Sequence, residues 1–243
     1  MRVLAVVIAC AALHAQPTLR IPPVTTRVTI EKQPVEVKVS GEVFVSAPAG
    51  GQQSIRVSLD ADLTDFQRNL TPILAAQLNQ ANRCGERLNV LDATMLPGAP
   101  AALLTVKAHV EKWACAKAFG KEIVKRLVGG DGTIALRLMP QVENGSSIKL
   151  AAEVTSIEAD GSLGELMRSD ALREKVRTTI VDAIQKSTDF NTTLPETLRE
   201  MVSVRGAQFA QTGERGLALA ISSDIRLPAA QARELLEKLT QAR

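Results

Sequence analysis

The stretch that decides the expected fold, residues 62–115, reads DLTDFQRNLTPILAAQLNQANRCGERLNVLDATMLPGAPAALLTVKAHVEKWAC. Its first part has apolar side chains at steps of three and four residues, a spacing that puts them on one face of a helix. These residues are Leu63, Phe66, Leu70, Ile73, Leu74 and Leu78. Because Pro72 lacks a backbone donor, it predicts a kink there or a restart of the helix at Thr71.

The second part of the stretch predicts a long hairpin with a cysteine at each base. Cys84 precedes a strand over residues 87–95, residues 97–100 (PGAP) are typical of a turn, and residues 102–113 return before Cys115. The turn lies nearly midway between the cysteines, so the hairpin brings them side by side, as a disulfide requires. Closing a loop of about thirty residues contributes roughly 3–4 kcal/mol in the chain-entropy model. A redox or metal role is the alternative, but nothing near either cysteine offers a second ligand.

The composition is that of a folded protein without a nucleic-acid surface. The 243 residues are 23% charged and 45% apolar, and the formal net charge is only +3. Five Phe, one Trp and no Tyr leave few rings for stacking on bases, and the basic residues are spread along the chain. We therefore expect a core of Val, Leu, Ile and Ala, and no nucleic-acid partner.

The N-terminus predicts export. Residues 1–15 have Arg2, an apolar run over residues 3–13 and a cleavage site at their end, which is the pattern of a signal peptide. In the alternative interpretation, residues 7–10 (VIAC) form a lipobox, and the protein is a lipoprotein anchored to the membrane through Cys10. Either start directs the chain out of the cytoplasm. The expected location is the bacterial periplasm, where a lone pair of cysteines is bridged.

Strands dominate the prediction outside this stretch. Apolar and polar residues alternate with a period of two in segments of residues 28–61, 134–154 and 202–227. Asn144-Gly145 predicts a tight turn within the second of these segments. Each such strand has one apolar and one polar face, which favours antiparallel pairing.

Three further helices are expected. Residues 117–128 have apolar residues at helical spacing among basic ones, and residues 129–132 (GGDG) are expected to end this short basic helix. Residues 163–186 have apolar side chains four residues apart and predict a second long helix. Residues 228–243 predict a surface helix at the C-terminus.

These elements together predict an α+β fold in which a highly curved antiparallel β-sheet wraps one or two long helices. Residues 16–243 are expected to form a single elongated domain. Its internal halves, 24–115 and 131–227, have the same order of parts, so two ββαββ repeats are a further reading of the chain.

Three segments carry a resemblance to a known family. They are residues 55–63 (IRVSLDADL), which run into the first helix, and the two hairpins that end at Trp113 and Leu227. In these segments the chain resembles the tubular lipid-binding superfamily, and it is most similar to bacterial envelope members of that group. The resemblance implies a curved sheet around a long helix, with lipid held along its length.

The sequence offers few candidates for catalytic or metal-binding residues. Beyond the leader the only histidine is His109, which alternates with Lys107 and Glu111 and is expected to face solvent. Residues 60–65 contain three aspartates but lack the glycine and the terminal glutamate of a calcium-binding EF-hand loop. We therefore expect no enzymatic activity, no catalytic residue, no metal and no cofactor.

The expected function is the binding of a lipid or another hydrophobic molecule between helix and sheet, in envelope lipid transport. The expected lining residues are Phe66, Leu70, Ile73, Val176, Ile180 and Ile184. The expected membrane-surface residues are Lys117, Lys121, Lys125 and Arg126, for which an ordinary solvated helix face is the alternative. The alternative function is a periplasmic scaffold or assembly factor with a filled core, which binds protein partners through its sheet edges.

Overall fold

The computed structural model describes most of the chain between residues 19 and 241. The described ranges are 19–46, 50–79, 84–118, 121–145, 147–161 and 202–241, together with the single residues 164, 174 and 178. They contain nine strands and three helices, in the order β1 (Leu19–Ile30), β2 (Gln33–Val45), β3 (Gln52–Asp62), α1 (Thr64–Arg68), α2 (Leu70–Leu78), β4 (Gly85–Gly98), β5 (Ala101–Ala118), β6 (Lys121–Glu143), β7 (Ser147–Ala159), β8 (Val202–Thr212), β9 (Gly216–Pro228) and α6 (Ala229–Gln241).

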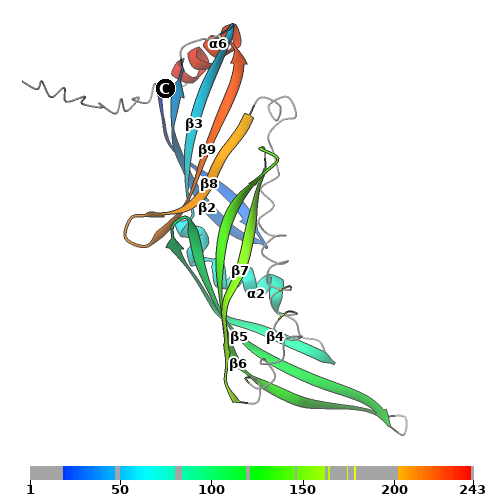
Figure 1. The fold of residues 1–243 in the computed structure, drawn as a ribbon. Helices are drawn as coiled ribbons and strands as arrows, with labels where there is room; N and C mark the ends of the chain where they lie inside the picture. The colour runs from blue at the N-terminus through cyan, green and yellow to red at the C-terminus, as the bar shows by residue number, and fades with distance from the viewer. Residues whose placement is uncertain are drawn as a thin grey trace, which may run out of the picture.

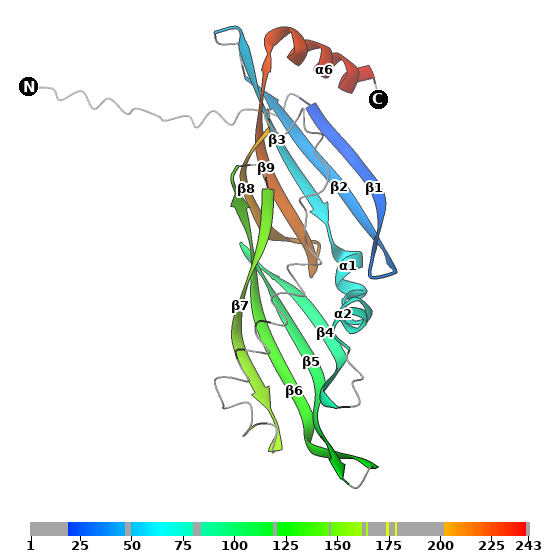
Figure 2. The same cartoon turned by 90° about the vertical axis from the view of Figure 1, so that its right-hand side faces the viewer.

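The strands form two antiparallel sheets. The first sheet has the order β1-β2-β3-β9-β8, and the second has the order β4-β5-β6-β7. Figures 1 and 2 show the sheets end to end in an elongated molecule, with α1 and α2 beside their junction and α6 at the far end of the first sheet. The last two strands therefore return to the N-terminal strands and do not extend the sheet that precedes them.

Strand β8 ties the two sheets together at their junction. The backbone N–H of Phe209 donates to the carbonyl oxygen of Pro100 at 2.9 Å, and the N–H of Val204 donates to that of Gly145 at 2.6 Å. Pro100 lies in the β4–β5 turn and Gly145 in the β6–β7 turn. The β4–β5 and β6–β7 turns of the second sheet thus contact an edge strand of the first, and they satisfy backbone groups that such an edge would expose.

The predicted fold class, a highly curved sheet wrapped around one or two long helices, is wrong. The described residues form mostly antiparallel strands in two sheets, and α1, α2 and α6 have only 5, 9 and 13 residues. The second predicted long helix, residues 163–186, lies outside the described residues except for positions 164, 174 and 178, and so does the leader, residues 1–15. Alternation identifies strands, but it does not show how they divide between sheets.

The ββαββ repeat is also wrong. Three strands, β1, β2 and β3, precede the helical segment, and that segment is divided into α1 and α2, so the first half is not a ββαββ unit. Strand β5 pairs with β6, and β9 pairs with β3. The internal halves 24–115 and 131–227 stay a prediction.

The expected hairpin and its disulfide are confirmed. Strands β4 and β5 pair along their length, from Gly85 opposite Trp113 to the predicted turn. Cys84 and Cys115 form a disulfide with a Cα–Cα distance of 5.7 Å. This bond indicates an oxidising compartment, as expected of an exported chain. Across the described part of the chain, no helix has the length and apolar character needed to cross a membrane.

The helix predicted at the start of the deciding stretch is present but divided. α1 ends at Arg68 and α2 begins at Leu70, one residue before the expected restart, with Asn69 between them. Pro72 is the third residue of α2, where a backbone N–H has no intrahelical acceptor in any case. The apolar face of α2 is buried, as its spacing predicts, through Leu70, Ile73, Leu74 and Leu78.

The basic helix predicted over residues 117–128 is wrong. Lys117 lies near the end of β5, and Lys121, Lys125 and Arg126 lie in β6, so the segment folds as the two strands of a hairpin. The glycine-rich residues that were expected to end the helix continue β6, paired with β5.

Two clusters of buried residues form the core. The larger cluster joins α2 to strands β4 to β9 at the junction of the sheets. The smaller cluster joins Ala232 of α6 to Val43, Ile55 and Leu227 at the far end of the first sheet. The β1–β2 hairpin contributes no residue to the larger cluster, and the space between that hairpin and the cluster is the candidate site.

Candidate functional site

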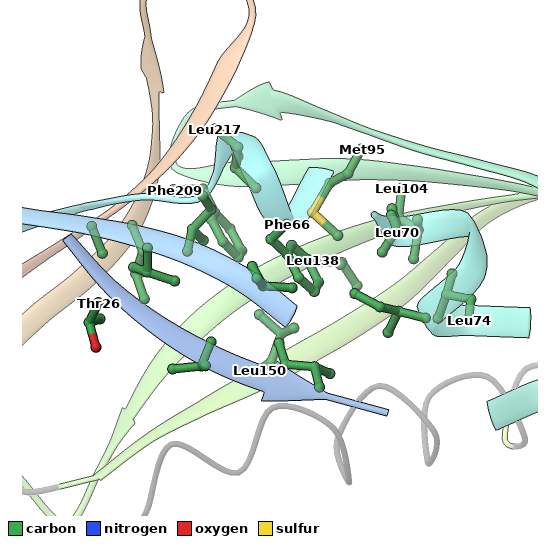
Figure 3. A pocket seen from close by; sticks show the side chains of 18 of the residues that line it. Thr26, Phe66, Leu70, Leu74, Met95, Leu104, Leu138, Leu150, Phe209 and Leu217 are labelled. Carbon is green, nitrogen blue, oxygen red and sulfur yellow. The ribbon is translucent and has the colours of Figure 1, made fainter. Parts of the chain in front are cut away.

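An apolar cavity lies at the junction of the two sheets, between the β1–β2 hairpin and the helices (Figure 3). Its volume is about 320 Å³, which is within the range of pockets that hold small organic molecules. All nine strands of the described chain, together with α1 and α2, contribute side chains to its wall. The cavity is therefore a product of the whole fold and not of one motif.

The wall of the cavity is apolar almost throughout. Of the nineteen lining residues, eighteen are apolar and the other is Thr26. Among the described residues the wall thus has one hydroxyl group and no ionisable side chain. A charged or strongly polar guest would lose its hydration there without a replacement partner. The site suits an apolar molecule, or the apolar part of an amphipathic one.

The cavity has a buried end and an open side. Leu104, Leu138 and Leu217 are at most 1% exposed and lie at the buried end. Val28 of β1 is 39% exposed and Thr26 is also exposed, and Figure 3 places Thr26 away from the helices. Because β1 is an edge strand of the first sheet, the cavity meets solvent along this edge.

Two polar contacts hold the β1–β2 hairpin against the helices. The backbone N–H of Glu36 donates to Asp65 Oδ2 at 2.8 Å, and Gln77 Nε2 donates to Glu31 Oε1 at 3.2 Å. Glu31 lies in the hairpin turn, so the hairpin is attached near its tip. Both contacts are exposed, and water competes for each partner, so they contribute little stability.

Gln67 of α1 connects both sheets beside the cavity. Its Nε2 donates to the carbonyl oxygen of Met95 at 2.7 Å, and its Oε1 accepts from the N–H of Leu217 at 2.7 Å. Met95 lies in β4 and Leu217 in β9, and both line the cavity. One side chain thus fixes two walls relative to the helix. No sequence pattern distinguishes Gln67 from the other polar residues of the helix.

Three of the six predicted lining residues lie in the cavity wall. Phe66 comes from α1, and Leu70 and Ile73 come from α2. The other three are Val176, Ile180 and Ile184, which lie outside the described residues.

Sequence reasoning missed the strand residues that form most of the wall. Leu104 and Leu138 come from the second sheet, and Phe209 and Leu219 come from the first. Their alternation marks each of them as inward-facing. Alternation within one strand does not show that the strand's inward face meets the inward face of a second sheet, and this meeting forms the cavity.

A group of polar side chains surrounds Glu111 in the second sheet, near the disulfide. Trp113 Nε1 donates to Glu111 Oε2 at 2.8 Å, and Arg126 Nη1 donates to Glu111 Oε1 at 3.1 Å. The guanidinium of Arg87 lies 4.2 Å from the centre of the Trp113 ring. The hydrogen bonds from Trp113 and Arg126 hold the pKa of Glu111 below its ordinary value. Trp113 therefore packs within this group and does not line the cavity.

His109 lies in the same group and is 37% exposed at its side chain. Its Nδ1 is 2.5 Å from Asp131 Oδ1, and its Nε2 is 3.6 Å from Glu111 Oε1. The hydrogen bond to Asp131 raises the pKa of His109 above its ordinary value. A histidine that holds its proton more tightly is a poorer general base near neutral pH. The arrangement is that of a charge network on a strand surface.

A second charge network crosses the first sheet at Asp224, which is 5% exposed. Arg205 of β8 and Arg56 of β3 flank this β9 residue, with nitrogen–oxygen distances of 2.5 Å and 3.3 Å. Burial alone would raise the pKa of Asp224, but the hydrogen bonds from both arginines outweigh burial and lower that pKa. The network links three neighbouring strands and lies outside the cavity wall.

No group of three or more His, Cys, Asp or Glu side chains that could hold a metal ion occurs in the part of the chain that the structure describes. No family model, curated protein or solved structure matches the chain. The resemblance to the tubular lipid-binding superfamily thus stays a prediction.

Proposed function

We propose that this protein binds a lipid or another elongated apolar molecule in the cavity between its two sheets. The observation that carries the proposal is a cavity of about 320 Å³ with one threonine in an otherwise apolar wall. An apolar occupant would take this wall out of contact with water, a transfer that the hydrophobic effect favours.

The volume sets the size of the occupant. One water takes about 30 Å³ of liquid, and a methylene group takes a similar volume, so the cavity holds about ten such groups. At about 0.8 kcal/mol per methylene, burying ten contributes roughly 8 kcal/mol before the costs of association are subtracted. An acyl segment of about ten carbons is therefore the ligand that fits best.

The open side sets the orientation of an amphipathic ligand. Of the described lining residues, Thr26 supplies the one hydroxyl group, and it lies on the exposed β1 edge. The buried end, near Leu104 and Leu138, has only apolar side chains. A lipid in this cavity directs its chain toward the buried end and leaves its headgroup in solvent beside β1.

We also propose that the protein acts in the bacterial periplasm, as a non-enzymatic component of envelope lipid transport. The apolar leader at residues 3–13 and the Cys84–Cys115 disulfide support export. A lipoprotein anchored through Cys10 is the alternative form of the same proposal. Sequencing the N-terminus of the mature protein separates the two forms.

A scaffold that binds protein partners is the competing function. The observation in its favour is the edge strand β1, on which Val24 and Val28 are 58% and 39% exposed. An edge of this kind accepts an added strand from another chain. Such a scaffold needs no ligand in the cavity, and this difference decides between the two functions.

The test combines native mass spectrometry with displacement of a fluorescent apolar probe. We expect protein purified without detergent to carry a lipid, and delipidated protein to bind N-phenylnaphthylamine until a fatty acid displaces it. Val28→Trp narrows the open side and is expected to weaken probe binding at least tenfold. Thr29→Trp is the matched control, because Thr29 alternates with Val28 and faces away from the cavity. An empty protein that takes up no probe, or equal probe binding by both variants, contradicts the proposal.

A further inference from the structure

The β5–β6 hairpin extends beyond the sheet to which it belongs. Strand β4 stops pairing with β5 at Trp113, and β7 pairs with β6 only from Gly132 onward. Residues 114–118 and 121–125 therefore have only each other as strand partners among the described residues. We call residues 114–118 and 121–127 the β5–β6 arm. Figures 1 and 2 show the arm projecting from the end of the molecule opposite to α6.

The base of the arm is cross-linked. An isolated two-stranded hairpin is marginally stable in water. Here the disulfide joins Cys115, inside the arm, to Cys84, next to β4. Arg126 of the arm donates to Glu111 in the sheet at 3.1 Å. The arm is thus held to the sheet by a covalent bond and an ion pair, which keep its surface in a fixed position.

The surface of the arm combines cations with exposed aliphatic side chains. Ile123 and Leu127 are 54% and 58% exposed, although large apolar side chains are mostly buried in this protein. Lys117, Lys125 and Arg126 are exposed on the same arm. Lys117 lies on the face opposite to Ile123, because its neighbour Ala116 is the residue that pairs with Ile123. Ile123 and Lys125 share one face of β6, because side chains alternate along a strand. Residues 114–127 contain four basic residues and one acidic residue.

We propose that the β5–β6 arm docks on an anionic lipid surface. Basic side chains are attracted to anionic headgroups, and exposed aliphatic side chains are buried at the boundary between headgroups and acyl chains. A nucleic acid would contact the cations through its phosphates but would leave Ile123 and Leu127 in water. An acidic protein partner would need about 800 Å² of surface on each side for a stable complex, and a narrow two-stranded ribbon offers little area.

Docking through the arm is a second property of the protein and does not depend on ligand binding in the cavity. The arm lies at one end of the second sheet, and none of its residues lines the cavity. A protein with an empty cavity would still dock through the arm, and a protein without docking would still fill its cavity. The two proposals therefore fail separately.

The experiment is co-sedimentation of the purified full chain with vesicles. One set is phosphatidylcholine alone, and the other is phosphatidylcholine mixed with phosphatidylglycerol. Two double variants alter the arm: Lys117→Gln with Lys125→Gln, and Ile123→Ser with Leu127→Ser. The matched control, Lys38→Gln with Arg215→Gln, removes two exposed cations away from the arm, one in β2 and one in the β8–β9 turn.

We expect binding to the anionic vesicles only, and less of it at higher salt, because screening shortens the range of the attraction. Each lost basic residue is expected to weaken the partition coefficient about fivefold, so the double lysine variant loses about 25-fold. The serine variant is expected to weaken binding at least as much, whereas the control stays within about twofold of the wild type. All variants are expected to unfold cooperatively in urea, as the wild type does, which shows that they are folded whether or not the cavity binds a probe.

Several results overturn the proposal. One is equal binding to neutral and anionic vesicles, and another is no binding to either. A third is the same loss in the control as in the lysine variant. A fourth is a serine variant that binds like the wild type, since the aliphatic side chains would then have no part in docking. Competition by single-stranded DNA at the affinity of the anionic vesicles would identify a general polyanion surface and also overturn it.

Discussion

Leu104 and Leu136 offer a matched pair of substitutions that tests the cavity. The two residues are direct neighbours across β5 and β6, and each is 1% exposed. Leu104 lines the cavity and Leu136 does not. Replacing either leucine by alanine removes three carbon groups, a transfer loss of about 2.4 kcal/mol at 0.8 kcal/mol per group. The two substitutions differ in the surroundings of the space that each one leaves.

The difference in surroundings gives different expected costs. Leu136→Ala opens a new void inside packed side chains, which adds a cavity term and brings the expected loss to about 4 kcal/mol. Leu104→Ala enlarges a cavity that already exists, and its side chain has fewer contacts to lose, so the expected loss is about 2.5 kcal/mol. Urea denaturation of the delipidated proteins measures both losses as changes in the free energy of unfolding.

The same pair also predicts a change in ligand preference. The wall atoms lost in Leu104→Ala leave room for about three more methylene groups of the ligand. In a displacement series of saturated fatty acids, the preferred chain is expected to lengthen by about three carbons in Leu104→Ala and to stay unchanged in Leu136→Ala. Equal destabilisation of the two variants, together with no change in preferred chain length, would refute the assignment of the cavity as a ligand site.

Two further predictions concern the second sheet. Replacing Cys84 and Cys115 by serine removes a bond between residues 31 apart. The expected loss is about 3–4 kcal/mol in the free energy of unfolding, measured in urea. Adding a reductant should lower the free energy of unfolding of the wild type by the same amount. The pKa of His109 is raised by its hydrogen bond to Asp131. The stability that this pair contributes is therefore complete below the unfolded pKa of about 6.5 and is lost as pH rises through the folded value. The stability difference between wild type and His109→Gln should shrink from about pH 5 to about pH 9, and a difference that grows with pH contradicts the assignment.

Elements whose signals lie within a few residues of one another were predictable from the sequence. The β4–β5 hairpin follows from a turn midway between two cysteines, and the disulfide at its base is present. The Asn144-Gly145 turn has positive φ at both residues, as a tight hairpin turn of this type requires. The C-terminal helix α6 also lies where its apolar spacing placed it.

The basic helix was predicted wrongly because of a bulge in β6. Leu127 has no partner where the β5–β6 register shifts between Lys112 and Trp113. The bulge accommodates the adjacent apolar residues 127 and 128, and the apolar pairs 123–124 and 127–128 lie four residues apart in the sequence. That spacing is the one a helix would show. Only the partner strand reveals the bulge, and a single sequence does not identify the partner.

The cavity could not be predicted because it forms between strands that are far apart in the chain. Phe66, Leu70 and Ile73 were expected to line a site, since they form the inner face of a helix. The β1–β2 hairpin closes the other side of the cavity, but its sequence shows only the alternation typical of two strands. Its position over α1 and α2 follows from the pairing of β2 with β3, and the alternation of either strand does not show which strand it pairs with.

The pairing of β3 with β9 has a consequence for the nascent chain. Arg56 and Asp224 lie side by side in the finished sheet although 168 residues separate them. Until β9 has been synthesised, β3 presents an unpaired edge to any neighbouring polypeptide, and long-range pairing of this kind is slow. Truncations before residue 216 would make that exposure permanent, so such fragments should aggregate strand to strand and need a holdase to stay soluble.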